Sequence, residues 1–158
     1  MFLEYQRGWK NNLNLPAYLR EQMSLDAEPA REVRDDRIRA AFAMAPGVIQ
    51  EFGMDAAGLR QVTIPTYLIV LAGDTTTPPK DNAEFAAKYI PHAHLDVLPG
   101  QVNHEIFDNE CDQLGRDNYP ESCVDAAGVD RVKLHEYIGN VALKFFDTNL
   151  KVRRQSPN

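Results

Sequence analysis

The segment IPTYLIVLAGDTTTPP, residues 64–79, decides the fold of this chain. Its apolar run, residues 67–72, is short, unbroken and rich in Val, Leu and Ile, which is typical of a strand buried on both faces of a parallel sheet. Gly73 gives the backbone the freedom to turn where that strand ends. Asp74 is therefore expected at the carboxyl edge of a central strand, where open α/β sheets bind their ligands.

The sequence predicts two further strands and two helices around this segment. One strand is IRAAFAM, residues 38–44, a buried strand of small residues, and the other is HLDVL, residues 94–98. The helices span 80–90 and 130–150, because their apolar residues recur at helical spacing. Thr-Pro at 77–78 predicts an N-cap followed by proline at the first helical position. This order of elements predicts an α/β fold, a small and mostly parallel sheet with flanking helices.

Length and composition limit the functions that are open to the chain. It has 158 residues, enough for a single domain over 1–158 with a core of its own. The net charge of −6 is spread along the chain, which argues against nucleic acid or an anionic membrane as a partner. No apolar run approaches the length of a membrane span, and the first residues show no secretory leader.

Asp74 and His104 are the candidate catalytic residues. Each follows a predicted parallel strand, so both are expected at the same edge of the sheet. A carboxylate that accepts a hydrogen bond from one imidazole nitrogen fixes the tautomer and leaves the other nitrogen free as a base. The chain order, acid before histidine, is that of the α/β-hydrolase triad. The alternative makes Asp74 a turn residue and His104 a solvated loop residue.

The remaining polar residues predict no cofactor and no metal. His104 and Glu105 begin a string like H-E-x-x-H, but position 108 is Asp, so zinc is not expected. No glycine-rich phosphate loop is present. His135 is expected on the charged, solvated side of the last helix.

Cys111 and Cys123 lie close together in a long polar segment, residues 105–128, for which no regular structure is predicted. They are a disulfide candidate in an oxidising compartment and a thiol pair in a reducing one. The bridge would tie the segment down and contribute about 2–3 kcal/mol. The compartment depends on it: periplasmic or secreted if the cysteines are bridged, and cytoplasmic otherwise.

The stretches PTYLIVLAGDTTTPP and HLDVLPGQVNHEIF resemble the last part of an α/β-hydrolase of the dienelactone hydrolase type, close to hydrolases related to platelet-activating-factor acetylhydrolase. The resemblance covers roughly residues 36–150 and includes IRAAFAMAPG, the two-cysteine loop and the closing helix with FFDTNL. It implies that Asp74 is the acid and His104 the base of a Ser-His-Asp triad, with Phe107 near the base. The implied substrate is a small carboxylic ester or lactone.

The chain departs from this family at the nucleophile. A nucleophile elbow needs G-x-S-x-G after a strand, and the three serines, Ser24, Ser122 and Ser156, do not lie between glycines. The turn that holds Asp74 is also shorter than the Gly-Glu-x-Asp form of the family. We therefore interpret the chain as the C-terminal part of an α/β-hydrolase fold that lacks the N-terminal strands and the elbow, with residues 1–37 as a remnant of a cap or inter-strand region. Alone it is expected to be inactive.

An interrupted fold of this kind predicts an exposed edge. The strand 38–44 would normally pair with the elbow strand, and without it a row of unpaired N–H and C=O groups is free to pair with another chain. The chain is therefore expected to form a homo-oligomer, to pair with a separate N-terminal half, or to aggregate. The alternative function is a non-catalytic interaction or structural module that assembles through this edge strand.

Overall fold

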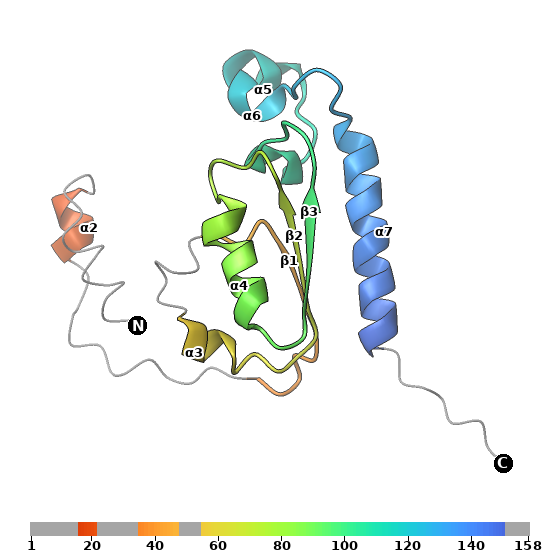
Figure 1. Ribbon diagram of the computed structural model, residues 1–158. Coiled ribbons are helices and arrows are strands. Elements are labelled where there is room, and N and C mark those ends of the chain that lie inside the picture. Colours follow the sequence, from red (N-terminus) through yellow and green to blue (C-terminus); the bar gives the residue numbers. More distant parts are fainter. Residues whose placement is uncertain (1–15, 22–34, 48–54, 151–158) are drawn as a thin grey trace.

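The computed structural model describes residues 16–21, 35–47 and 55–150, and in that part the chain forms a small sheet flanked by helices (Figure 1). The elements in chain order are α2 (Ala17–Glu21), β1 (Ala41–Met44), α3 (Ala56–Leu59), β2 (Thr66–Leu71), the 3₁₀ turn η1 (Pro79–Asp81), α4 (Ala83–Tyr89), β3 (Ala93–Leu98), the 3₁₀ turn η2 (His104–Phe107), α5 (Gln113–Asn118), α6 (Pro120–Cys123) and α7 (Arg131–Leu150). Most of residues 1–37, the expected cap remnant, lies outside the described residues. Over the described ranges, no helix has the length and hydropathy needed to cross a membrane.

β2 is the central strand of a three-stranded sheet with the order β1-β2-β3, and both pairings are parallel. Thr66 pairs with Ala41 on one side and with Ala93 on the other. The apolar residues 68–71 are all buried, as expected for a strand with neighbours on both sides. The predicted α/β class, with a small parallel sheet and flanking helices, is thus confirmed.

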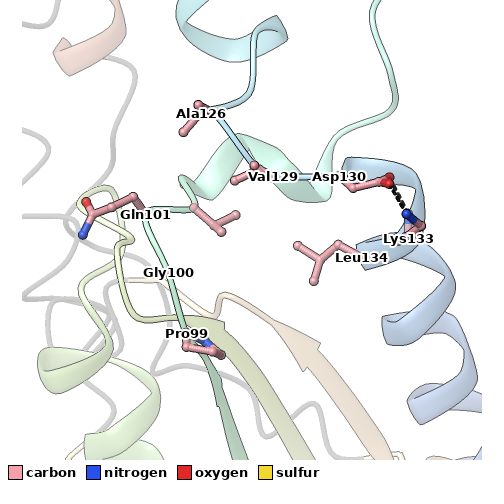
Figure 2. Close-up of a pocket in the computed structure, with 11 residues that line it drawn as sticks. Pro99, Gly100, Gln101, Ala126, Val129, Asp130, Lys133 and Leu134 are labelled. Carbon is pink, nitrogen blue, oxygen red and sulfur yellow. Dashed lines mark hydrogen bonds and ion pairs between the residues drawn. The ribbon is translucent and has the colours of Figure 1, made fainter.

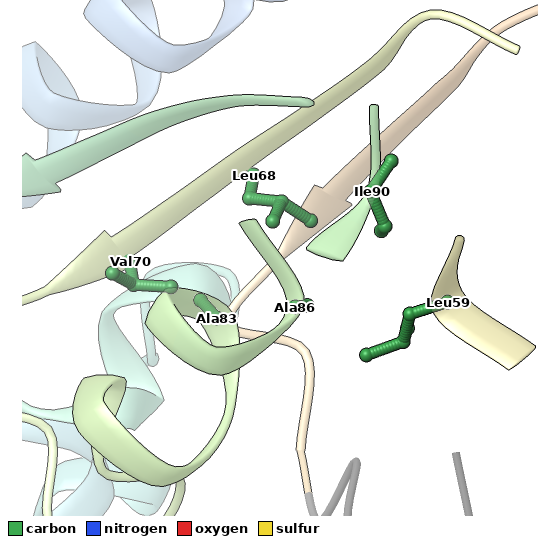
Figure 3. Close-up of a cluster of buried hydrophobic side chains, with 6 residues drawn as sticks. All are labelled: Leu59, Leu68, Val70, Ala83, Ala86 and Ile90. Carbon is green, nitrogen blue, oxygen red and sulfur yellow. The ribbon is translucent and has the colours of Figure 1, made fainter. Parts of the chain in front are cut away.

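Each face of the sheet has its own hydrophobic core, because successive side chains of β2 point to opposite faces. The core between the sheet, α3 and α4 contains Leu59, Leu68, Val70, Ala83, Ala86 and Ile90 (Figure 3). The core on the other face, towards α7, contains Ile69, Leu71, Leu98, Val102, Ile106 and Ile138. Helices therefore cover both faces of β2 and hold the ends of β2 and β3 in place.

β1 is less buried than the sequence predicts. The strand is confined to Ala41–Met44, its side chains are half-buried or exposed, and Met44 is 51% exposed. The physical reason is its position, since β1 pairs only with β2 and its outer edge has no neighbour among the residues that the structure covers. The expectation of a buried strand over 38–44 is wrong, since β1 covers only Ala41–Met44 and none of its residues is fully buried, and the expectation of an exposed edge is consistent with this arrangement.

The segment 105–128, expected to lack regular structure, contains η2, α5 and α6. Cys111 and Cys123 form a disulfide. Asp112 is the N-cap of α5, and its side chain accepts a hydrogen bond from the backbone N–H of Gly115. Gly115 packs directly against the bridge, where a Cβ would come within 3.3 Å of the Cys123 sulfur. Helices of four to six residues are too short to show a hydrophobic period, which explains why they were not predicted.

Candidate functional site

The carboxyl ends of β2 and β3 bring Asp74 and His104 together. Both loops leave the same edge of the sheet because the strands are parallel. Gly73 is needed for their close approach: a Cβ at this position would lie 3.1 Å from the Gly100 carbonyl oxygen and 3.2 Å from the Val102 backbone. The absence of a side chain at position 73 therefore lets the loop carrying Asp74 touch the loop carrying His104.

The side chain of Asp74 is fully buried and is held by four hydrogen bonds. Its Oδ1 accepts from the backbone N–H of Thr76 at 2.9 Å and of Thr77 at 2.8 Å. Its Oδ2 is 2.8 Å from the Thr77 hydroxyl and 2.9 Å from Nδ1 of His104. A buried carboxylate is tolerated when all its acceptor positions are satisfied in this way.

These hydrogen bonds keep the Asp74 carboxylate ionised. Burial acts to raise the pKa of Asp74, but the hydrogen bonds from Thr77 and from His104 outweigh it, and the pKa lies below the usual aspartate value. An ionised carboxylate can only accept hydrogen bonds. Nδ1 of His104 must therefore carry the proton in the contact with Oδ2, and in the neutral ring Nε2 is left as the basic nitrogen.

His104 begins η2, and its side chain is 33% exposed. The ring meets Phe107 edge-on at 6.4 Å, the neighbour that the family resemblance implied. Nε2 has no hydrogen-bond partner within residues 16–21, 35–47 and 55–150, whereas Nδ1 is engaged by Asp74. The arrangement can accept a proton at Nε2 from a hydroxyl or a water, with the resulting imidazolium stabilised by the buried carboxylate.

Thr77 is a third residue of this site, and its role was not predicted. The sequence suggested an N-cap at Thr77 with Pro78 as the first helical residue. Instead Pro78 precedes η1, and the Thr77 hydroxyl lies between Asp74 and His104, 3.2 Å from Nδ1. Thr77 does not act as a cap because the turn begins one residue later than expected, at Pro79, with Pro78 in the N-cap position and no side-chain cap hydrogen bond.

No serine completes the site within the part of the chain that the structure describes. Ser122 is the one serine there; it lies in α6, its carbonyl accepts a hydrogen bond from Arg131, and no hydrogen bond joins it to His104. The same residues contain no group of three metal-ligating side chains. Ser24 and Ser156 lie outside the described residues.

A cavity of about 480 Å³ lies between the loop that follows β3 and the segment that leads into α7 (Figure 2). Pro99 and Val102 from the loop, Ala126, and Leu134 of α7 line it, and the Asp130–Lys133 ion pair stands at its wall. Neither Asp74 nor His104 contributes to the lining. His135, expected to be solvated, is instead half-buried and hydrogen-bonds through Nε2 to the Ile106 carbonyl.

Comparison with known proteins adds little to this geometry. No family model and no curated protein matches the chain. Among solved structures, it is similar to the peroxisomal alpha-beta-hydrolase Lpx1 from Saccharomyces cerevisiae, with a TM-score of 0.35 and 23% sequence identity over 65% of this chain. The match spans 22% of that protein's length.

Proposed function

We propose that Asp74 and His104 are the acid and the general base of an α/β-hydrolase-type triad that cleaves carboxylic esters or lactones, with the nucleophilic hydroxyl supplied from outside the described residues. The observation that carries the proposal is the 2.9 Å contact between Nδ1 of His104 and Oδ2 of Asp74. In the reaction, Nε2 of His104 takes the proton of the attacking hydroxyl and later returns it to the leaving group. Asp74 orients the ring and stabilises the imidazolium.

Three further features support a catalytic rather than a structural pair. The carboxylate is buried and ionised while the imidazole is partly open to solvent, so the charged partner is fixed and the proton-transferring partner is accessible. The pair lies at the carboxyl edge of a parallel sheet. The free edge of β1 is on the side of the sheet away from β3, where a further strand carrying a nucleophile can add.

The test joins the chain to a polypeptide that supplies the missing hydroxyl. The DNA preceding the codon for Met1 is searched for an in-frame sequence that encodes a predicted β-strand followed by G-x-S-x-G, and the protein that includes this segment is produced. This protein is assayed with p-nitrophenyl butyrate and with a fluorophosphonate that labels activated serines. We expect turnover and labelling, with His104→Gln reducing turnover at least 100-fold, about the contribution of a general base. His92→Gln, an exposed histidine before β3, is the matched control and should leave turnover unchanged. Equal turnover in His104→Gln would refute the proposal.

The same assay on the chain alone has a defined expectation. Because none of its serines lies in a G-x-S-x-G pattern, the chain alone should neither label nor turn over the ester beyond the background of free imidazole. Turnover by the chain alone that His104→Ala abolishes would contradict the statement that a nucleophile must be supplied from elsewhere.

We propose as the second candidate a non-catalytic module that assembles through β1, and the exposure of that strand's apolar residues favours it. Met44 in β1 is 51% exposed and Ile38, three residues before the strand, is 58% exposed, and the outer edge of β1 has no neighbour in the described chain. Sedimentation velocity should then show a dimer or larger species that Met44→Lys dissociates, because a charge on an edge strand opposes pairing. Val97→Lys on the opposite edge strand is the control. A compact monomer at all concentrations would exclude this candidate.

A further inference from the structure

We propose that Thr77 is a positioning residue whose hydroxyl holds the proton of His104 on Nδ1; this role rests on the proposed function of the Asp74–His104 pair. The Thr77 hydroxyl oxygen lies 2.8 Å from Oδ2 of Asp74 and 3.2 Å from Nδ1 of His104. A hydroxyl has a single proton to donate. When it donates to the carboxylate, its lone pairs remain for the N–H of His104, so the imidazole proton faces two acceptor oxygens in place of one.

The surroundings of Thr77 keep its hydroxyl in this position. Thr77 is 7% exposed, and its own backbone N–H is bound to Oδ1 of Asp74 at 2.8 Å. Its methyl group packs on Gly47, where an added Cβ would come within 2.7 Å. With the backbone fixed on one side and the methyl group on the other, the hydroxyl cannot rotate away from Asp74 without losing packing.

Thr77 also connects the ends of all three strands. Its hydroxyl is 3.4 Å from the carbonyl oxygen of Ala45, the residue that follows β1. Ala45 adopts a φ of 39°, a left-handed backbone conformation that a non-glycine residue adopts only when its surroundings require it. The carboxyl ends of β1, β2 and β3 thus meet at one side chain: β1 through Ala45, β2 through Asp74 and the loop after β3 through His104.

The alternative tautomer of His104 would leave this cluster unsatisfied. With the proton on Nε2, Nδ1 would present a lone pair to the Asp74 carboxylate, and both groups would be acceptors. The Thr77 hydroxyl could then donate to only one of them. Removing the hydroxyl weakens the preference for the Nδ1–H tautomer, because the ring proton then has one acceptor oxygen in place of two.

The test measures where the imidazole proton resides, by two-bond ¹H–¹⁵N correlation on the full chain at a pH where the ring is neutral. His104 signals are assigned from their loss in His104→Gln. His135 provides an internal reference of the opposite tautomer, since its Nε2 donates to the Ile106 carbonyl. We expect His104 to be protonated on Nδ1 in the native chain, and Thr77→Val to shift its tautomer ratio towards Nε2–H about fivefold, the size expected for one hydrogen bond.

Two matched variants separate the hydroxyl from the fold. Thr77→Ser keeps the hydroxyl and should retain the native tautomer, whereas Thr76→Val, at an exposed neighbour that contacts Asp74 only through its backbone, should change nothing. Thr77→Ala repeats the test of Thr77→Val without the risk of overpacking. An unchanged His104 tautomer in both Thr77→Val and Thr77→Ala, with His135 native, would overturn the proposal. Because the readout is a proton position and not turnover, it is independent of whether the pair proves catalytic.

Discussion

Asp74 and Arg131 are two buried charged side chains that are both stabilised by several hydrogen bonds. They differ in the groups to which those hydrogen bonds lead. Asp74 is fully buried at the carboxyl edge of the sheet, and Arg131 is 6% exposed at the start of α7. Arg131 binds the Asp125 carboxylate through Nε and Nη2, with a shortest contact of 2.7 Å. Its remaining hydrogen bonds go to the carbonyl groups of Asp108, Asn109 and Ser122. Both charges are thus compensated by several hydrogen bonds, as buried charges must be.

The difference lies in where each network ends. The hydrogen bonds of Arg131 all end on protein acceptors and tie residues 108–125 to the helix, so this network is closed. The hydrogen bonds of Asp74 lead to His104, whose second ring nitrogen has no partner in the described chain and whose side chain is partly exposed. A closed network contributes stability, whereas an open one leaves a ring nitrogen accessible, and this distinction can be tested by substitution.

The largest expected effect is that of Arg131→Met. It leaves Asp125 unpaired and three carbonyl groups without their donor, so the free energy of unfolding should fall by about 3–5 kcal/mol. His104→Gln should cost less than about 1 kcal/mol, because a glutamine amide can still donate to Asp74 and the site is partly exposed. Urea unfolding followed by circular dichroism measures both. Equal losses in the two variants would remove the distinction between a closed and an open network.

A smaller effect is expected for the disulfide, which lies within residues 108–125, the segment that the hydrogen bonds of Arg131 hold to α7. Replacing Cys111 and Cys123 together by alanine should lower the free energy of unfolding by about 2–3 kcal/mol, the loop-entropy cost of opening the bridge. The Asp74–His104 contact should remain, since neither residue touches the bridge. Reduction with dithiothreitol should reproduce the loss in the native chain and have no effect on the double variant. Loss of the Nδ1–H signal of His104 in that variant would instead show that the disulfide-containing segment and the Asp74–His104 site are energetically coupled.

The smallest expected effect is the acid dependence contributed by Asp74. Its pKa is lower in the folded chain than the unfolded value of about 3.9, so the folded state favours the ionised form. The resulting stability is present above that value and is lost as the pH falls through the folded pKa. Asp74→Asn should therefore be less stable than the native chain at neutral pH and show a shallower fall in stability below about pH 4. Asp130→Asn, at an exposed carboxylate paired with Lys133, is the control and should change the slope less.

The central strand and the pairing of Asp74 with His104 could be predicted because parallel topology places the ends of successive strands on one edge. A single long apolar run was enough to place Asp74, and its short turn proved sufficient to reach His104. The contacts of Thr77 and Arg131 could not be predicted, because each depends on partners that are brought near only by folding. His135 was expected in solvent for the same reason, since its acceptor, the Ile106 carbonyl, is 29 residues away in the chain.

Asp74 and His104 come from one β-α-β unit, β2-α4-β3, and are only 30 residues apart. A crossover of this size closes a short loop, and the entropy lost in closing a loop rises with the number of residues in it. The pair can therefore assemble as soon as two adjacent strands and their connecting helix have condensed, before any distant segment docks. Whatever polypeptide borders β1 would meet a carboxylate–imidazole contact that is already formed.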